Sequence, residues 1–150
     1  MQEKMQLEAQ VWGRILGQKH EEYTEKDDIL KLLEQEYHAR AGYLCLKKRL
    51  PQQAVLVQKL LGCTENNIKI LKTMYYLEYG RCYPEKKCGN TEVFCACRFL
   101  REQYRRLKTA VFLREKRDFK GSEWEFLEEK WEHNRRVQSR LILCLLQGLL

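Results

Sequence analysis

The chain has 150 residues, which suits one domain with a substantial buried core. Its residues are 44% hydrophobic and 33% charged, with only two prolines, and this mixture favours a folded, charge-rich helical protein over a disordered one. The net charge of +7 suits an acidic partner or nucleic acid, although a solvated basic face is the simpler explanation.

Residues 1–23 predict a helical extension, either packed on the rest of the chain or free, with Met5, Val11, Trp12 and Ile15 among its apolar residues. This end lacks the apolar core and small-residue cleavage site of a signal peptide. No run reaches about 18 uncharged apolar residues. We therefore expect a cytoplasmic protein without a membrane span, whose seven cysteines are reduced rather than paired.

Two helices are predicted in the first half of the remaining chain, because apolar residues recur there at helical spacing and strand alternation is absent. Thr24 is the candidate N-cap of the first helix, and Pro51 separates the two helices and fits the first turn of the second. The first stripe consists of Ile29, Leu32, Leu33, Glu36, Ala39 and Tyr43. The second consists of Val55, Gln58, Leu61, Ile68, Leu71, Tyr75 and Leu77.

Two more helices are predicted after a long connection at residues 80–90, which is rich in turn residues. Asn90 or Thr91 can cap the third helix, and Ser122 followed by Glu125 has the spacing of a capping box for the fourth. The third stripe consists of Phe94, Cys97, Leu100, Tyr104, Leu107, Val111 and Phe112. The fourth runs through Phe126, His133, Val137, Leu141 and Cys144 to Leu150, after a short turn at residues 118–122.

Residues 24–150 therefore predict an all-α, antiparallel four-helix bundle made of two helical hairpins, with helices of about 25 residues. Short connections force the helices of each hairpin to be antiparallel neighbours. A faint internal repeat supports two hairpins, because residues 29–43 can be laid on residues 100–113. In that alignment Glu36 falls on Leu107 and Ala39 on Ala110.

The order of three segments resembles the ferritin-like superfamily, and within it the small rubrerythrin-like proteins of anaerobic Firmicutes. The segments are EYHARAGYLCL in the first helix, YYLEYGRCYPEKKC at the end of the second, and LEEKWEHNRRVQSRLILCLLQGLL in the fourth. Together they extend the resemblance over roughly residues 25–150. The resemblance implies a ferritin-like bundle with a di-iron centre, held by one glutamate from each of two helices and a Glu-x-x-His pair from each of the others.

The resemblance assigns a metal role to Glu36 in the first helix and to Glu65 in the second. The family pattern is then broken twice, because Ile68 stands where histidine is required and Leu107 where a glutamate is required. In the fourth helix the remaining candidates are Glu129, Glu132 and the adjacent His133. The site is therefore incomplete and degenerate, and Ile68 and Leu107 are expected to pack as core. Two alternatives are about equally supported: an intact di-iron centre, and a mononuclear site at Glu36, Glu65 and His133.

A second metal hypothesis concerns zinc at four cysteines near the long connection, because four thiolates can hold zinc tetrahedrally. The spacing is C-x5-C-x6-C-x-C rather than two C-x-x-C pairs, so buried or redox-labile thiols are favoured over a zinc site. The four cysteines are Cys82, Cys88, Cys95 and Cys97. The other three cysteines, Cys45, Cys63 and Cys144, are predicted to lie in the core.

Residues 98–120 carry nine basic and three acidic residues, which could attract nucleic acid non-specifically. We do not expect nucleic-acid binding, because nothing resembles a recognition-helix pair. The motifs of hydrolases, P-loop proteins and dinucleotide-binding enzymes are also absent from the sequence.

Two function hypotheses remain, and they leave open whether the protein is an enzyme. One is an iron-binding oxidoreductase that reduces oxygen or peroxide at a degraded di-iron site. The other is a metal-free helical scaffold that acts through protein contacts, such as a homodimer or another protein partner. Carboxylates that converge opposite Glu36 would favour metal, whereas an interior closed by Ile68, Leu107 and Val137 would favour the scaffold.

Overall fold

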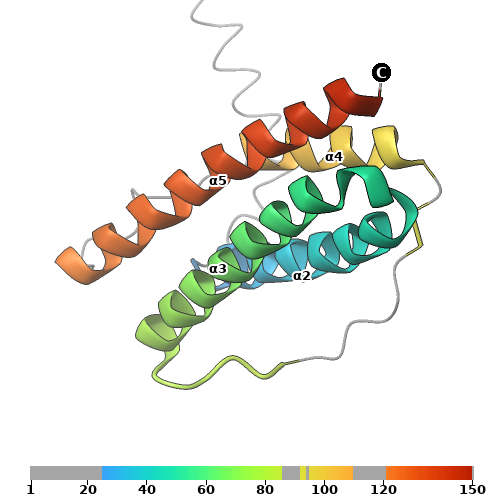
Figure 1. The fold of residues 1–150 in the computed structure, drawn as a ribbon. Helices are drawn as coiled ribbons and strands as arrows, with labels where there is room; N and C mark the ends of the chain where they lie inside the picture. Colours follow the sequence, from blue (N-terminus) through green and yellow to red (C-terminus); the bar gives the residue numbers. More distant parts are fainter. Residues whose placement is uncertain (1–24, 86–91, 94, 110–120, 150) are drawn as a thin grey trace, which may run out of the picture.

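The computed structural model describes residues 25–85, 92, 93, 95–109 and 121–149, and in the first helix it describes side chains from residue 29 onwards. It contains α2 (Glu25–Arg49), the 3-10 turn η1 (Pro51–Gln53), α3 (Ala54–Tyr79), α4 (Ala96–Thr109) and α5 (Ser122–Leu149) (Figure 1). The described residues form no strand, which confirms the all-α prediction. The predicted extension 1–23, the predicted caps Thr24, Asn90 and Thr91, and residues 118–120 of the predicted turn lie outside the described residues. So do four residues of the predicted stripes: Phe94, Val111, Phe112 and Leu150. Helix α4 has 14 described residues, fewer than the predicted 25 or so.

Helices α2 and α3 form the predicted antiparallel hairpin. Pro51 opens η1 directly after α2, as expected of a residue whose fixed φ suits a first turn. Near this turn Lys47 Nζ donates to Gln58 Oε1 at 2.6 Å. Further from the turn, Arg40 of α2 pairs with Glu65 of α3 at 3.4 Å.

The connection after α3 returns along the hairpin before α4 begins. Gly80 ends α3 in the left-handed conformation, with a φ of 67° that glycine adopts without strain. Tyr83 then stacks on Tyr37, with ring centroids 6.1 Å apart, whereas Val93 packs in the cluster around Tyr43, two turns further along α2. As a result α4 runs in the same direction as α3, as Figure 1 shows.

Helix α5 packs against both α3 and α4 and is antiparallel to each of them (Figure 1). Gln138 of α5 meets Asn67 of α3 near the middle of both helices. At the α2–α3 turn, Gly148 near the end of α5 approaches Gln53. The described part of the chain is therefore a bundle of two helix pairs joined by one long connection, with antiparallel packing between neighbours.

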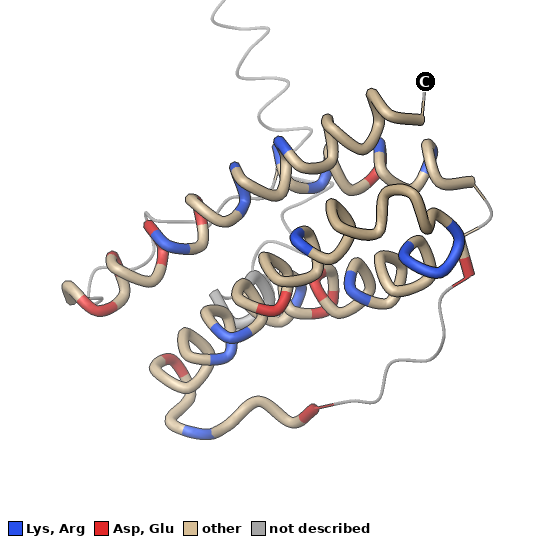
Figure 2. Tube along the Cα trace, viewed as in Figure 1, with Lys and Arg blue, Asp and Glu red and all other residues tan. Residues whose placement is uncertain are grey.

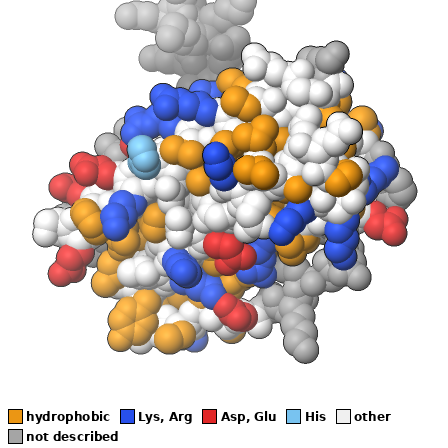
Figure 3. Space-filling model, in the orientation of Figure 1, with side chains coloured by type: hydrophobic (Ala, Val, Ile, Leu, Met, Phe, Trp, Pro, Cys, Tyr) orange, Lys and Arg blue, Asp and Glu red, His pale blue; other side chains and the backbone are white. Residues whose placement is uncertain are grey.

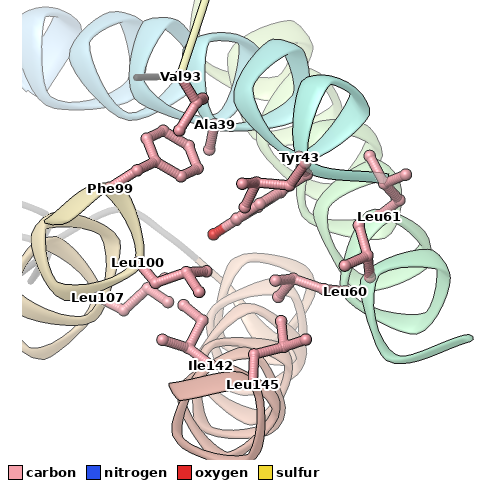
Figure 4. Close-up of a cluster of buried hydrophobic side chains, with 12 residues drawn as sticks. Ala39, Tyr43, Leu60, Leu61, Val93, Phe99, Leu100, Leu107, Ile142 and Leu145 are labelled. Atoms are coloured by element: carbon pink, nitrogen blue, oxygen red, sulfur yellow. The ribbon is translucent and has the colours of Figure 1, made fainter. Parts of the chain in front are cut away.

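The apolar core consists of two clusters, one toward each end of the bundle. The cluster toward the start of α5 contains Ile29, Leu32, Leu33, Tyr37, Ile68, Ile70, Leu71, Met74, Tyr75, Trp124 and Trp131. The cluster beside the α2–α3 turn contains Ala39, Tyr43, Leu46, Val57, Leu60, Leu61, Val93, Phe99, Leu100, Leu107, Ile142 and Leu145. Figure 4 shows side chains of this second cluster converging from the helices, with Tyr43 reaching into their midst.

The predicted core face is confirmed for α2 and is wrong for α5. All six residues of the α2 stripe are buried. On α5 the predicted Phe126, His133 and Cys144 are exposed, and Val137 and Leu141 are half-buried. Seven α5 residues are buried instead: Trp124, Glu128, Trp131, Gln138, Ser139, Ile142 and Leu145. Four of them, Trp124, Trp131, Gln138 and Leu145, recur at a seven-residue spacing. The two tryptophans direct this face inward, because large aromatic side chains contribute the most buried apolar area.

Smaller corrections concern α3 and the start of α5. Val55, Gln58 and Leu77, expected on the α3 core stripe, are exposed, because the face of α3 that contacts both α2 and α5 runs through Leu60, Thr64, Asn67, Leu71 and Met74. The Gly121 carbonyl accepts hydrogen bonds from the backbone N–H groups of Trp124 and Glu125. Gly121 is therefore the cap of α5, one residue before the predicted Ser122.

Candidate functional site

A layer of buried polar side chains lies where the two apolar clusters meet, and every helix of the bundle contributes to it. We call it the polar layer. It consists of Glu36 of α2, Thr64 and Asn67 of α3, Gln103 and Arg106 of α4, and Gln138 of α5. Such groups are costly to bury unless they bond to one another, so their partners decide what the layer can do.

An ion pair between Glu36 and Arg106 joins α2 to α4. Arg106 Nη1 donates to Glu36 Oε1 at 2.8 Å, and the two side chains are 11% and 2% exposed respectively. Arg106 Nε also donates to Gln103 Oε1 at 2.8 Å. This hydrogen bond within α4 holds the guanidinium in its orientation toward Glu36. The negative charge of Glu36 is thus compensated by a cation that stays protonated in proteins.

The side-chain amide of Gln138 joins three helices. Its Nε2 donates to Thr64 Oγ1 at 3.1 Å and lies 3.5 Å from Glu36 Oε2, while its Oε1 accepts from Asn67 Nδ2 at 2.8 Å. Thr64 Oγ1 donates in turn to the Leu60 carbonyl at 2.9 Å. This chain of donors and acceptors fixes the orientation of each amide.

Tyr43 lies seven residues after Glu36 on α2, which is about two helical turns. Its side chain is fully buried. Burial raises the pKa of its hydroxyl well above the ordinary value, and the nearby Glu36 acts in the same direction while Arg106 opposes both. Tyr43 therefore stays neutral. Within the described part of the chain, Asn67 Oδ1 is a buried polar atom of this layer without a hydrogen-bond partner.

Of the predicted metal ligands, the structure places only Glu36 in this interior. Glu65 has a side chain that is 48% exposed and points to Arg40. Glu129 and His133 are exposed on α5, and Glu132 is half-buried. Ile68 and Leu107 pack as core, as predicted.

A groove between α3 and α5 brings Glu129 and His133 together. It has a volume of about 530 Å³. Its lining is Asn66, Lys69, Ile70, Phe126, Glu129, Lys130, His133 and Asn134. Lys130 Nζ lies 4.5 Å from the centre of the Phe126 ring, so the groove combines an exposed aromatic ring with amine and amide donors.

The cysteines are not gathered into one cluster by the described structure. Cys82 and Cys95 are exposed and Cys97 is half-buried, while Cys88 lies outside the described residues. Cys45 and Cys63 are half-buried, and Cys144, predicted as core, is exposed. In the described ranges, no three His, Cys, Asp or Glu side chains are grouped so that they could hold a metal ion.

Several residues of the interior were not predicted, although the spacing of some contains a signal. Gln138 lies seven residues from both Trp131 and Leu145, and Gln103 lies between Leu100 and Leu107 at helical spacing. Glu128, rather than Glu129 or Glu132, is the buried carboxylate of α5, where Trp124 Nε1 donates to it at 2.9 Å. No sequence pattern pairs Arg106 with Glu36, because they lie on different helices.

Comparison with protein-family models, with curated proteins and with solved structures gives no match to this chain. Among the described helices, none is long and apolar enough to cross a membrane.

Proposed function

We propose that this protein is a metal-free helical scaffold that acts through contacts on its outer surface. We also propose that its bundle is a ferritin-like one in which a glutamate–arginine pair occupies the position of the di-iron centre. The observation that carries this proposal is the 2.8 Å bond between the buried Glu36 and Arg106.

The donor set of the polar layer does not suit two iron ions. A di-iron centre of this superfamily needs four glutamates and two histidines around the metals. The described polar layer offers a single carboxylate, with a threonine hydroxyl, three amide side chains and a guanidinium. A guanidinium bonded to that carboxylate supplies the positive charge that a metal would supply, and it repels a second cation.

The connectivity of the helices supports the ferritin-like part of the proposal. One long connection joins two antiparallel pairs, so that α3 and α4 run in the same direction (Figure 1). Ferritin-like bundles have one such crossover, whereas simple up-and-down bundles have short loops throughout. The polar layer then has a positional role, since a buried polar network can fix how helices are aligned with one another.

Exposed apolar side chains support a role in surface contacts. Phe126 is 56% exposed at the α3–α5 groove, and Val55 is 71% exposed near the start of α3. Aromatic side chains next to a groove are frequent anchors of protein interfaces. A partner that places an apolar group against Phe126 would bury both.

Iron loading under anaerobic conditions tests the proposal. The purified protein is offered ferrous iron, excess iron is removed, and iron per chain is counted for the wild type, Glu36→Gln and the matched control Glu34→Gln at an exposed position of α2. We expect the same low iron content in all three. About two irons per chain, lost in Glu36→Gln but kept in Glu34→Gln, would support the oxidoreductase instead.

A further inference from the structure

Helix α4 has an apolar inner face and a strongly basic outer face. Phe99, Leu100, Gln103 and Leu107 are buried. Four basic residues occupy the opposite side at helical spacing, and all are exposed: Arg98, Arg101, Arg105 and Lys108. Arg106 is the only basic residue of this helix whose charge is used inside the bundle.

Among the residues that the structure describes, few acidic groups compensate this outer face. Glu102, the one acidic residue of α4, pairs with Arg98 at 3.3 Å. Helix α5 packs on α4, and its second half, residues 134–149, has no acidic residue but carries the exposed Arg136 and Arg140. The acidic residues of α5 all lie in its first half, away from Arg136 and Arg140 (Figure 2). Figure 3 shows basic side chains gathered at the upper left edge of the face drawn there.

Every exposed residue of α4 is also polar or charged. The exposed residues are the four basic ones, Glu102 and Thr109. A protein partner usually needs an apolar or aromatic anchor at the centre of its contact, and a membrane surface needs an apolar helix face. Nucleic-acid interfaces are more polar and much more positively charged. Arginine, which supplies five of the six basic residues, binds phosphate through two parallel hydrogen bonds.

We propose that the outer face of α4, together with Arg136 and Arg140 of α5, binds the phosphate backbone of nucleic acid without reading its bases. The four α4 side chains extend over about 15 Å of helix, which is the rise of about four base pairs. Such binding needs no recognition-helix pair, whose absence from the sequence argued against nucleic acid. The proposal goes beyond the scaffold function, and it stands or falls independently of iron content.

The test measures the binding of a fluorescent DNA duplex of mixed sequence over a range of salt concentrations. The full-length wild type is compared with Arg101→Ala/Arg105→Ala and with Lys48→Ala/Arg49→Ala. The second pair removes the same charge from exposed positions at the end of α2. Each lost phosphate contact lowers the slope of log K against log salt by about 0.9. We therefore expect a slope smaller by about 2 in the α4 variant and an unchanged slope in the α2 variant.

Three results would overturn the proposal. Equal slope changes in the two variants would mean that net charge alone attracts DNA. Absence of binding by the wild type at about 50 mM salt would exclude a phosphate-binding face, because non-specific binding is strongest at low salt. Tighter binding of polyglutamate than of the duplex would assign the face to an acidic protein. Circular dichroism of each variant confirms that these surface substitutions leave the helices intact.

Discussion

The ring of Phe99 on α4 lies directly against the backbone of α2 at Gly42. A Cβ atom added at Gly42 would overlap three carbons of that ring. The two helices approach closely here because glycine has no side chain, and Tyr43 holds the Phe99 ring from the side in an edge-on contact with centroids 5.6 Å apart. Gly42 is therefore a packing requirement of the fold rather than a turn residue.

Gly42→Ala is expected to lower the free energy of unfolding by about 1–3 kcal/mol, because overpacking forces neighbouring side chains and backbone to shift. Gly62→Ala on α3 is the matched control, since a Cβ there meets no atom within 4 Å. That control should gain about 0.5–1 kcal/mol from its better helix propensity. Urea unfolding of both variants gives the comparison, and a Gly42→Ala protein as stable as its control would contradict the close approach.

Gln138→Leu is expected to lower the free energy of unfolding by about 1–3 kcal/mol despite the greater hydrophobicity of leucine. The change removes the partner of Asn67 Nδ2 and leaves that buried donor unsatisfied. Gln147→Leu, at an exposed position of the same helix, should have little effect. A Gln138→Leu protein that is as stable as the wild type would show that the amide network does not contribute to folding.

Tyr43 makes stability depend on alkaline pH. Its pKa in the folded protein lies above the ordinary value of about 10, so the folded state keeps a proton that the unfolded state releases. The stability linked to this proton is complete below pH 10 and decreases as the pH rises above that value. Tyr43→Phe should therefore lose stability less steeply than the wild type between about pH 10 and 11. Parallel curves for the two proteins would contradict the burial of this hydroxyl.

The cysteines are expected to react with an alkylating reagent in two groups. Cys82, Cys95 and Cys144 are exposed and should be modified first. Cys63 should be modified slowly, because burial raises the pKa of its thiol and lowers the fraction of reactive thiolate. Peptide mass spectrometry after short exposure of the folded protein measures the order. Early modification of Cys63 together with Cys82 would contradict the placement of α3 in the bundle.

The sequence predicted the helices better than it predicted which residues lie inside them. Helix boundaries at Pro51 and Gly80 follow from the backbone preferences of proline and glycine, which are local. The local sequence does not determine which face of α5 points inward, because this helix carries apolar residues on more than one side. Packing against α3 and α4 selected Trp124 and Trp131 over Phe126.

The interior site was predictable only in part for a similar reason. Glu36 could be singled out because it stands on an otherwise apolar stripe, where a carboxylate requires a partner. The sequence does not reveal that this partner is Arg106, seventy positions away on another helix. A basic residue in a basic helix gives no sign that it turns inward, so the tertiary structure was needed to find the pair.

A double-mutant cycle on Glu36 and Arg106 tests the central claim most directly. The free energies of unfolding of Glu36→Gln, Arg106→Gln and the double variant are compared with that of the wild type. We expect each single change to cost about 3 kcal/mol or more, since it leaves one buried charge without its partner. The double variant should lose about 1–3 kcal/mol less than the sum of the two single losses. Losses that add to within about 0.5 kcal/mol would mean that the two side chains do not interact, and the account of a scaffold held by this pair would be wrong.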